Sequence, residues 1–294
     1  MAPTGRSTLS LAQLVKGYGL HQQAKGCTLT TRETARRALA GLARSLPQQC
    51  LDDVAAITQG HVVEWAAGLD RYADATRDQR IAKVKAFFAW AAREGFIPDN
   101  PAASLKRPRN NWQPTPMTQD QLRRVLVAAG KTRQPERDSA IVSLLIDTGL
   151  RASELCAAPL NALNLDSGQL RVVGKGGAQR VLVVGKRTKS ALWRWLMVRP
   201  QVDAPNLFAS QNGKPLARTV LGRHIRHIGE RAGVTPCYPH LFRHTFAIMY
   251  LRAGGDAYSL QYLLGHSDMT VTRMYVSIAA VDVGELYKSP LDRL

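Results

Sequence analysis

The residues that could do chemistry stand in four short clusters in the second half of the chain. They are arginines, a lysine, histidines and a tyrosine, side chains that bind phosphate, move protons or, for an activated tyrosine, attack phosphorus. The candidate catalytic residues are Arg151, Lys175, His240, Arg243, His266 and Tyr275, with Glu154 in a supporting position. Together they indicate a site for a phosphate group, provided that the fold brings these distant clusters together.

The first two clusters supply an arginine and a lysine. Arg151 follows the turn Thr148-Gly-Leu150 and opens a helical segment, so its guanidinium should lie where the free N–H groups of a helix N-terminus favour an anion. Glu154 follows on the same helical face, although such a pair is usually an ordinary surface ion pair. Lys175 stands between two glycines of a turn and could donate a proton or bind phosphate, although most turn lysines only face solvent.

The other two clusters supply histidines, a second arginine and a tyrosine. His240 follows Pro239, which fits the first position of a helix, and Arg243 then shares its helical face. His266 follows a glycine that ends a helix and should be exposed there, and Tyr275 lies in the next helical segment. A phenol with an ordinary pKa near ~10 attacks only where cations or a base stabilise the phenolate, and a packed aromatic is the more common role of a single tyrosine.

Hydrophobic periodicity predicts the elements that must position these residues. Helices are expected near 9–18, 30–45, 59–69 and 81–91, from the capping residue Thr118, and near 138–148, 188–197, 217–232, 240–253, 258–264 and after 268. The β-type runs 170–173 and 180–184 flank a glycine-rich turn, which predicts a hairpin. The fold class is therefore mainly α with a small β-sheet.

A proline-rich basic stretch interrupts the helical pattern and suggests two domains. We interpret residues 106–116 as a linker between a helical domain, residues 1–105, and a second domain, residues 117–294, that ends in a C-terminal tail.

The charge balance indicates a polyanionic partner. The chain has 40 Lys and Arg against 22 Asp and Glu, a net charge of +18, and both parts share the excess. Each cation that meets a phosphate releases a condensed counterion, which favours binding to nucleic acid. For any single basic residue a solvated surface is the more common role, but as a group several could follow a DNA backbone. These are Arg77, Arg80, Lys83, Lys85, Lys106, Arg107 and Arg109.

Composition excludes several other classes. A chain of 294 residues with 45% apolar residues is globular, and is neither collagen, coiled coil nor wholly disordered. Cys27, Cys50, Cys156 and Cys237 are far apart, so we expect buried, reduced thiols and neither a disulfide framework nor a zinc site. No apolar stretch approaches the ~20 residues of a membrane span, and we expect a cytoplasmic protein without a membrane partner.

The four clusters, in this order, resemble the tyrosine recombinase (phage integrase) family. The matching motifs are TGLRASEL, the Gly-Lys-Gly hairpin, PHLFRHTFA and LLGHSDMTVTRMY, which span residues 148–276. Residues 60–101 resemble, less specifically, the core-site-binding domain of that family. The resemblance implies an N-terminal helical, SAM-like core-binding domain followed by an α+β catalytic domain. Xer-like or transposon-encoded simple recombinases are the nearer comparison within the family.

The resemblance also implies how the phosphate is cut. Arg151 and Arg243 would bind the non-bridging oxygens of the scissile phosphate, and Tyr275 would attack it to form a 3′-phosphotyrosine link. Two planar guanidinium groups and imidazole donors can meet the charge of such a phosphoryl transfer, so we expect neither a metal nor another cofactor.

Four further residues would move protons, bond the phosphate or hold the site together. Lys175 would protonate the departing 5′-oxygen and His240 would act in acid/base transfer. His266 would bond the phosphate, and Glu154 would hold the active-site arginine and histidine in place. The segment between His240 and Arg243 is Leu-Phe rather than the frequent Lys-Leu, which leaves these roles unchanged.

The implied function is site-specific recombination of double-stranded DNA through a Holliday junction, in integration, excision or resolution. A tetramer on two DNA sites is expected, in which the tail, residues 281–294, docks on a neighbouring protomer or packs on its own. Two alternatives remain open at this point. One is a type IB topoisomerase that relaxes DNA with similar chemistry, and the other is a catalytically inactive DNA-binding regulator.

Overall fold

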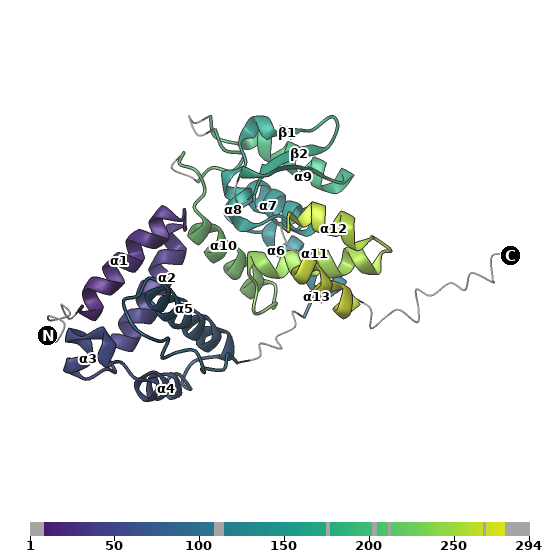
Figure 1. Cartoon of the computed structure of the whole chain (residues 1–294). Coiled ribbons are helices and arrows are strands. Elements are labelled where there is room, and N and C mark those ends of the chain that lie inside the picture. Colours follow the sequence, from purple (N-terminus) through teal and green to yellow (C-terminus); the bar gives the residue numbers. More distant parts are fainter. Residues whose placement is uncertain are drawn as a thin grey trace, which may run out of the picture. The chain divides into compact units, whose positions relative to one another are not determined.

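The chain forms two compact units, Met1–Trp112 and Gln113–Leu294. The computed structural model describes residues 9–108, 115–174, 177–201, 205–210, 213–266 and 269–279. Each unit has its own hydrophobic core, and Figure 1 draws the first unit in purple to dark blue and the second in teal to yellow. Within the described ranges no helix has the length and apolar character needed to cross a membrane.

The first unit is a helical bundle in which α1 and α2 pack on α5 (Asp74–Arg93). Its other elements are α1 (Leu11–Ala24), α2 (Leu29–Ala43), α3 (Gln48–Asp52), a 3₁₀ turn (Val54–Ala56) and α4 (Gln59–Ala67). The apolar residues of α5 recur at helical spacing and are buried, as the sequence predicts. Ser10, Thr28 and Thr58 begin α1, α2 and α4 by accepting a backbone N–H bond.

The second unit consists of helices around α7 (Pro135–Thr148), which contacts α6, α9 and α11. The other helices are α6 (Gln119–Ala129), α8 (Ala152–Ala157), α9 (Lys186–Val198), α10 (Arg218–Arg231), α11 (Pro239–Arg252), α12 (Ala257–Leu264) and α13 (Met269–Ala279), with a 3₁₀ turn at Leu160–Ala162. Thr118 caps α6 and Pro239 occupies the first turn of α11, as predicted.

A small antiparallel sheet lies between α8 and α9 in the sequence. Its strands are β1 (Leu163–Asn164), β2 (Gln169–Val173) and β3 (Gln179–Val183), in the order β1-β2-β3. The hairpin of β2 and β3 is the predicted one, and its register places Val172 opposite Arg180. The mainly helical fold with a small sheet is therefore confirmed. The sequence did not predict β1, because a strand of two residues is too short to show a hydrophobic period.

The last helices form a separate layer of the second unit. α12 and α13 pack on α11 through a buried cluster of Ala247, Ile248, Leu260, Leu264 and Tyr275 (Figure 1). The helix that carries the candidate nucleophile is thus held against the helix that carries His240 and Arg243. This packing brings two of the four sequence clusters together.

One expectation about the thiols needs correction. Cys50 and Cys237 are buried, but Cys27 and Cys156 are only half-buried. All four are free thiols.

Candidate active site

Arg151 caps the N-terminus of α8 and is tied to Glu154 in the first turn of that helix. The backbone N–H of Arg151 donates to Glu154 Oε2 at 2.8 Å, and its Nη1 donates to Glu154 Oε1 at 2.8 Å. The carboxylate therefore fixes both the backbone and the guanidinium of the arginine. Glu154 is 3% exposed, so this is a buried contact and not the ordinary surface pair that its spacing suggests.

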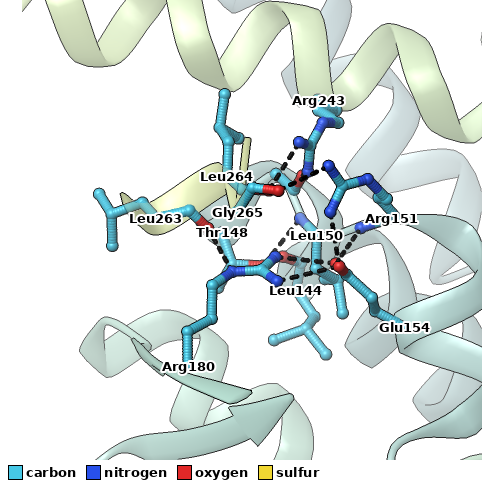
Figure 2. A network of polar contacts seen from close by, with 11 residues as sticks. Leu144, Thr148, Leu150, Arg151, Glu154, Arg180, Arg243, Leu263, Leu264 and Gly265 are labelled. Atoms are coloured by element: carbon cyan, nitrogen blue, oxygen red, sulfur yellow. Dashed lines mark hydrogen bonds and ion pairs between the residues drawn. The ribbon is translucent and has the colours of Figure 1, made fainter. Parts of the chain in front are cut away.

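The C-terminal end of α12 gathers three arginines from different parts of the second unit (Figure 2). Three successive backbone carbonyls there each accept a hydrogen bond from a different guanidinium. The pairs are Arg180 Nε with Leu263, Arg243 Nη2 with Leu264, and Arg151 Nη2 with Gly265, at 2.7, 2.7 and 2.9 Å. Carbonyls at the end of a helix lack helical partners and carry its partial negative charge, so they attract cations.

Arg180 is the arginine that sequence reasoning missed. It lies on β3, is 6% exposed, and donates from Nη1 and Nη2 to the two oxygens of Glu154 at 2.9 and 2.8 Å. Burial alone would raise the pKa of Glu154, but the bonds and charges of Arg180 and Arg151 outweigh it, and the pKa lies below its usual value. The carboxylate is therefore ionised at neutral pH.

Arg243 is almost completely buried, at 1% exposure. Its Nη1 donates to the carbonyl of Gly149 at 3.1 Å. Burial, with the nearby charge of Arg151, lowers the pKa of Arg243 to about 10, so the group stays charged at neutral pH. Gly149 ends α7 with a φ of 58°, and a Cβ there would lie 2.6 Å from Phe246, so this close approach requires glycine.

Tyr275 lies in the same chain, within hydrogen-bond distance of a histidine next to Arg243. The Tyr275 hydroxyl is 2.7 Å from His244 Nδ1, and the tyrosine is 1% exposed. Burial raises the pKa of Tyr275 against the opposing charges of Arg243 and Arg151. The ring of His240, which is itself exposed, stands edge-on to His244 with 4.3 Å between the centroids.

His266 follows the break after α12, as predicted, but it is half-buried and not exposed. Gly265 ends α12 with a φ of 62°, and His266 Nδ1 then lies 3.0 Å from Thr272 Oγ1. The imidazole is nearly parallel to the ring of Tyr275, with 6.2 Å between the centroids. Burial, followed by the charges of Arg243, Arg151 and Arg180, lowers the pKa of His266 to about 4.

Two predicted site residues, Lys175 and Arg109, lie outside the described residues. The structure brings Arg151, Glu154, Arg243, His266 and Tyr275 together with the unpredicted Arg180 and His244. Among the described residues, Glu154 makes hydrogen bonds to two arginines and to no histidine.

The basic residues of the first unit differ in whether their charged groups already have hydrogen-bond or ion-pair partners within the protein. Arg77 pairs with Asp70 and Asp74, the guanidinium of Arg107 makes two bonds to Asp78, and the Lys85 ammonium donates to backbone carbonyls of residues 103 and 105. Arg80 lies over the ring of Tyr72, 3.9 Å from its centroid. Lys83 and Lys106 have no hydrogen bond or ion pair with any described residue.

The assembled groups suit reaction at a phosphodiester. Among the contacts of the described residues, Arg151 and Arg243 each use two of the five N–H donors of a guanidinium, which leaves donors for phosphate oxygens. A neutral phenol lies beside imidazoles that can pass a proton. Within the described ranges no group of three or more His, Cys, Asp and Glu residues is placed to hold a metal ion.

Comparison with known proteins gives one consistent result. The sequence pattern of the phage integrase family matches residues 116–281. A tyrosine recombinase XerC of Alcanivorax borkumensis is 35% identical over 220 residues, 72% of this chain and 72% of the relative. In fold the chain is similar to the XerH site-specific recombinase bound to its palindromic difH substrate, with a TM-score of 0.78, 20% identity, and coverage of 94% of this chain and 84% of that one. It is also similar to a lambda integrase in a tetramer bound to a Holliday junction, with a TM-score of 0.75, 19% identity, and coverage of 90% and 79%.

Proposed function

Because this chain belongs to the phage integrase family and is a tyrosine site-specific recombinase, we propose that Tyr275 is its nucleophile. The phenol oxygen attacks the scissile phosphorus, the bond from phosphorus to the 5′-oxygen breaks, and a 3′-phosphotyrosine link forms. That link retains the phosphodiester free energy for religation. This proposal rests on the position of the Tyr275 hydroxyl. It lies 2.7 Å from His244 Nδ1, on α11, the helix that also carries His240 and Arg243.

Arg151 and Arg243 bind the non-bridging oxygens of the phosphate in this proposal. Both guanidinium groups donate to neighbouring carbonyls at the end of α12, so they lie close to one another and retain donors. Phosphoryl transfer spreads negative charge over the equatorial oxygens, and donors held in place for that charge lower the barrier. Glu154 holds Arg151 in this position.

Protons move through the lysine and the histidines. Lys175 gives a proton to the departing 5′-oxygen. His244 contacts the phenol and His240 stands against His244 at the solvent-exposed edge, so the phenol proton has a short path outward, in line with acid/base transfer by His240. His266 keeps Nε2 for the phosphate because its Nδ1 contacts Thr272.

Double-stranded DNA is the partner, and the first unit is its core-site-binding domain. Residues 106–116 link this domain to the catalytic domain, residues 117–294. The net charge of +18 supports a DNA partner, and the lambda integrase tetramer on a Holliday junction supports strand exchange by four protomers on two sites.

We assign the tetramer contact to the tail, residues 281–294, which lies outside the described residues. Its apolar segment VDVGELY could cover apolar surface on a neighbouring protomer. A chain that ends at residue 280 should bind one DNA site but fail to bring two sites together in native gel electrophoresis. Normal synapsis by the shortened chain would contradict this assignment.

A covalent adduct tests the central proposal. The protein is incubated with duplexes that have a randomised central segment and a nick, so that the short cleaved strand diffuses away and cleavage becomes irreversible. DNA that stays bound to protein after denaturation is recovered and sequenced, which also identifies the site. Tyr275→Phe should abolish the adduct and retain DNA binding, since only the attacking oxygen is lost. Adduct formation by this variant would refute Tyr275 as the nucleophile.

A further inference from the structure

We propose that Arg180 is a positioning residue of the cleavage reaction, which joins Glu154 to the end of α12 and thereby fixes the two arginines that bind the phosphate. The inference rests on the proposed roles of Arg151 and Arg243. Arg180 belongs to none of the four sequence clusters, and it reaches the site from β3, next to the hairpin turn (Figure 2).

Each of the three nitrogens of the Arg180 guanidinium donates a hydrogen bond within the protein. Nη1 and Nη2 bond the two oxygens of Glu154, and Nε donates to the carbonyl of Leu263 at 2.7 Å. Three of its five N–H donors are used within the protein, against two in Arg151 and two in Arg243. Only the planar fork of arginine can bond a carboxylate at both oxygens while a third donor points to another element. Its contacts therefore fit a role through other residues.

Glu154 depends on Arg180 for half of its hydrogen bonds. Each carboxylate oxygen accepts one bond from Arg151 and one from Arg180. Without Arg180, the buried carboxylate would lose one bond at each oxygen and its nearest compensating charge apart from Arg151. The carboxylate that orients Arg151 would then be free to turn or to take up a proton.

The end of α12 depends on Arg180 in the same way. Arg180, Arg243 and Arg151 bond three consecutive carbonyls, so a shift of the first carbonyl moves the acceptors of the other two. The guanidinium also fills the space beneath two glycines. A Cβ on Gly265 would lie 2.8 Å from Arg180 Nη1, and a Cβ on Gly174, at the hairpin turn, 3.6 Å from it. One side chain thus touches α8, α12 and the hairpin.

The test measures the rate of covalent cleavage. The probe is the nicked duplex recovered with the wild-type protein, used with saturating protein, so that the single-turnover rate constant is independent of DNA affinity. Arg180→Met should lower this rate constant about 10²-fold, as expected for misplaced transition-state donors, without weakening DNA binding. Arg180→Lys keeps the charge but has one nitrogen for three acceptors, so its rate constant should lie between those of Arg180→Met and the wild type.

The rate constant separates positioning from simple loss of folding. A variant that only unfolds lowers the fraction of DNA cleaved, whereas the folded fraction still cleaves at the wild-type rate constant. Arg180→Met with Glu154→Gln removes the whole buried ion pair, so no unpaired charge opposes folding, and this double variant should also be slow. Arg171→Met, an exposed arginine on the neighbouring strand β2, is the matched control and should cleave at the wild-type rate.

The possible outcomes are distinct. A wild-type rate constant in Arg180→Met, or in the double variant, would overturn the positioning role. An equal loss of rate constant in Arg171→Met would also overturn this role, because the effect would then not depend on the contacts of Arg180. If the wild-type protein itself formed no adduct, the proposed function would fail, which is a different result from a slow variant beside an active wild type.

Discussion

His244 and His266 are neutral at physiological pH, and the arginines supply the fixed positive charge of the site. Burial is the main reason that the pKa values of His244 and His266 fall to about 4, and the nearby charge of Arg243 adds to it. A neutral imidazole can both donate and accept a hydrogen bond. The arginines therefore supply the charge stabilisation, while the neutral imidazole of His244, beside the phenol, is suited to proton transfer.

These low pKa values predict a dependence of stability on pH. A histidine in the unfolded chain titrates near ~6.5, so between that pH and about 4 the unfolded state binds more protons than the folded state. The free energy of unfolding should fall as the pH is lowered through this window, and above it the two histidines should contribute no such dependence. Urea titrations at several pH values measure this fall, with hydrogen exchange of peptides from α11 to α13 as the readout of unfolding.

The double variant His244→Gln with His266→Gln should show a smaller fall over the same window. His227→Gln, at an exposed position of α10, serves as the matched control and should keep the wild-type fall. A double variant with an unchanged pH dependence would show that these two side chains are not buried in their neutral form.

Motif spacing predicted most of the residues that the structure gathers, but it missed Arg180 and His244. From the sequence alone, either residues 180 and 182 or residues 181 and 183 could form the buried face of this strand, and a charged residue such as Arg180 is expected to face solvent. The register of the hairpin decides the question, since Arg180 pairs with the buried Val172. His244 follows Arg243 directly, and only the packing of α13 on α11 reveals its contact with Tyr275.

At the scale of the elements, the way in which α12 ends determines where its last carbonyls accept hydrogen bonds from the three arginines. Gly265 stops the helix in a left-handed conformation, with a φ of 62°, and leaves room for Arg180. Gly265→Ala should cost about 1 kcal/mol for the backbone conformation and more for the displaced guanidinium. We expect a lower melting temperature and, because Arg151 and Arg243 lose their carbonyl partners, slower covalent cleavage.

Gly254→Ala is a matched control for this prediction. Gly254 also has a positive φ, 88°, but a Cβ there meets no atom within 4 Å. It should therefore carry the backbone cost alone and keep the wild-type cleavage rate. Equal losses of melting temperature and cleavage rate in Gly265→Ala and Gly254→Ala would mean that the space beside Arg180 is unimportant.

The sequence predicts elements best where a long apolar periodicity or a cap marks them. Thr118, Pro239 and Gly265 are at the positions that the sequence assigns to them, since each has a local backbone reason. α3 and β1 are not predicted because five and two residues are too short to establish a period. The convergence of the four clusters is likewise a property of tertiary packing, which no single segment encodes.

At the scale of the whole molecule, net charge indicates the class of partner but not which cations are available to it. Arg77 and Arg107 in the first unit are paired with aspartates, whereas Lys83 and Lys106 have no partner among the described residues. The pair of Arg107 with Asp78 joins residues that are distant in sequence, and composition cannot reveal such a pair. The structure therefore narrows the set of candidate phosphate contacts.

The salt dependence of DNA affinity can distinguish these two groups of cations. A cation that contacts a phosphate contributes ~0.9 to the slope of log affinity against log salt concentration. Lys83→Gln with Lys106→Gln should therefore lower that slope by nearly two and weaken binding most at low salt. Arg107→Gln, the control, should change the slope less, because Asp78 already neutralises its guanidinium through bonds of 2.6 and 2.8 Å. An unchanged slope in the lysine variant would place the DNA backbone elsewhere on the first unit.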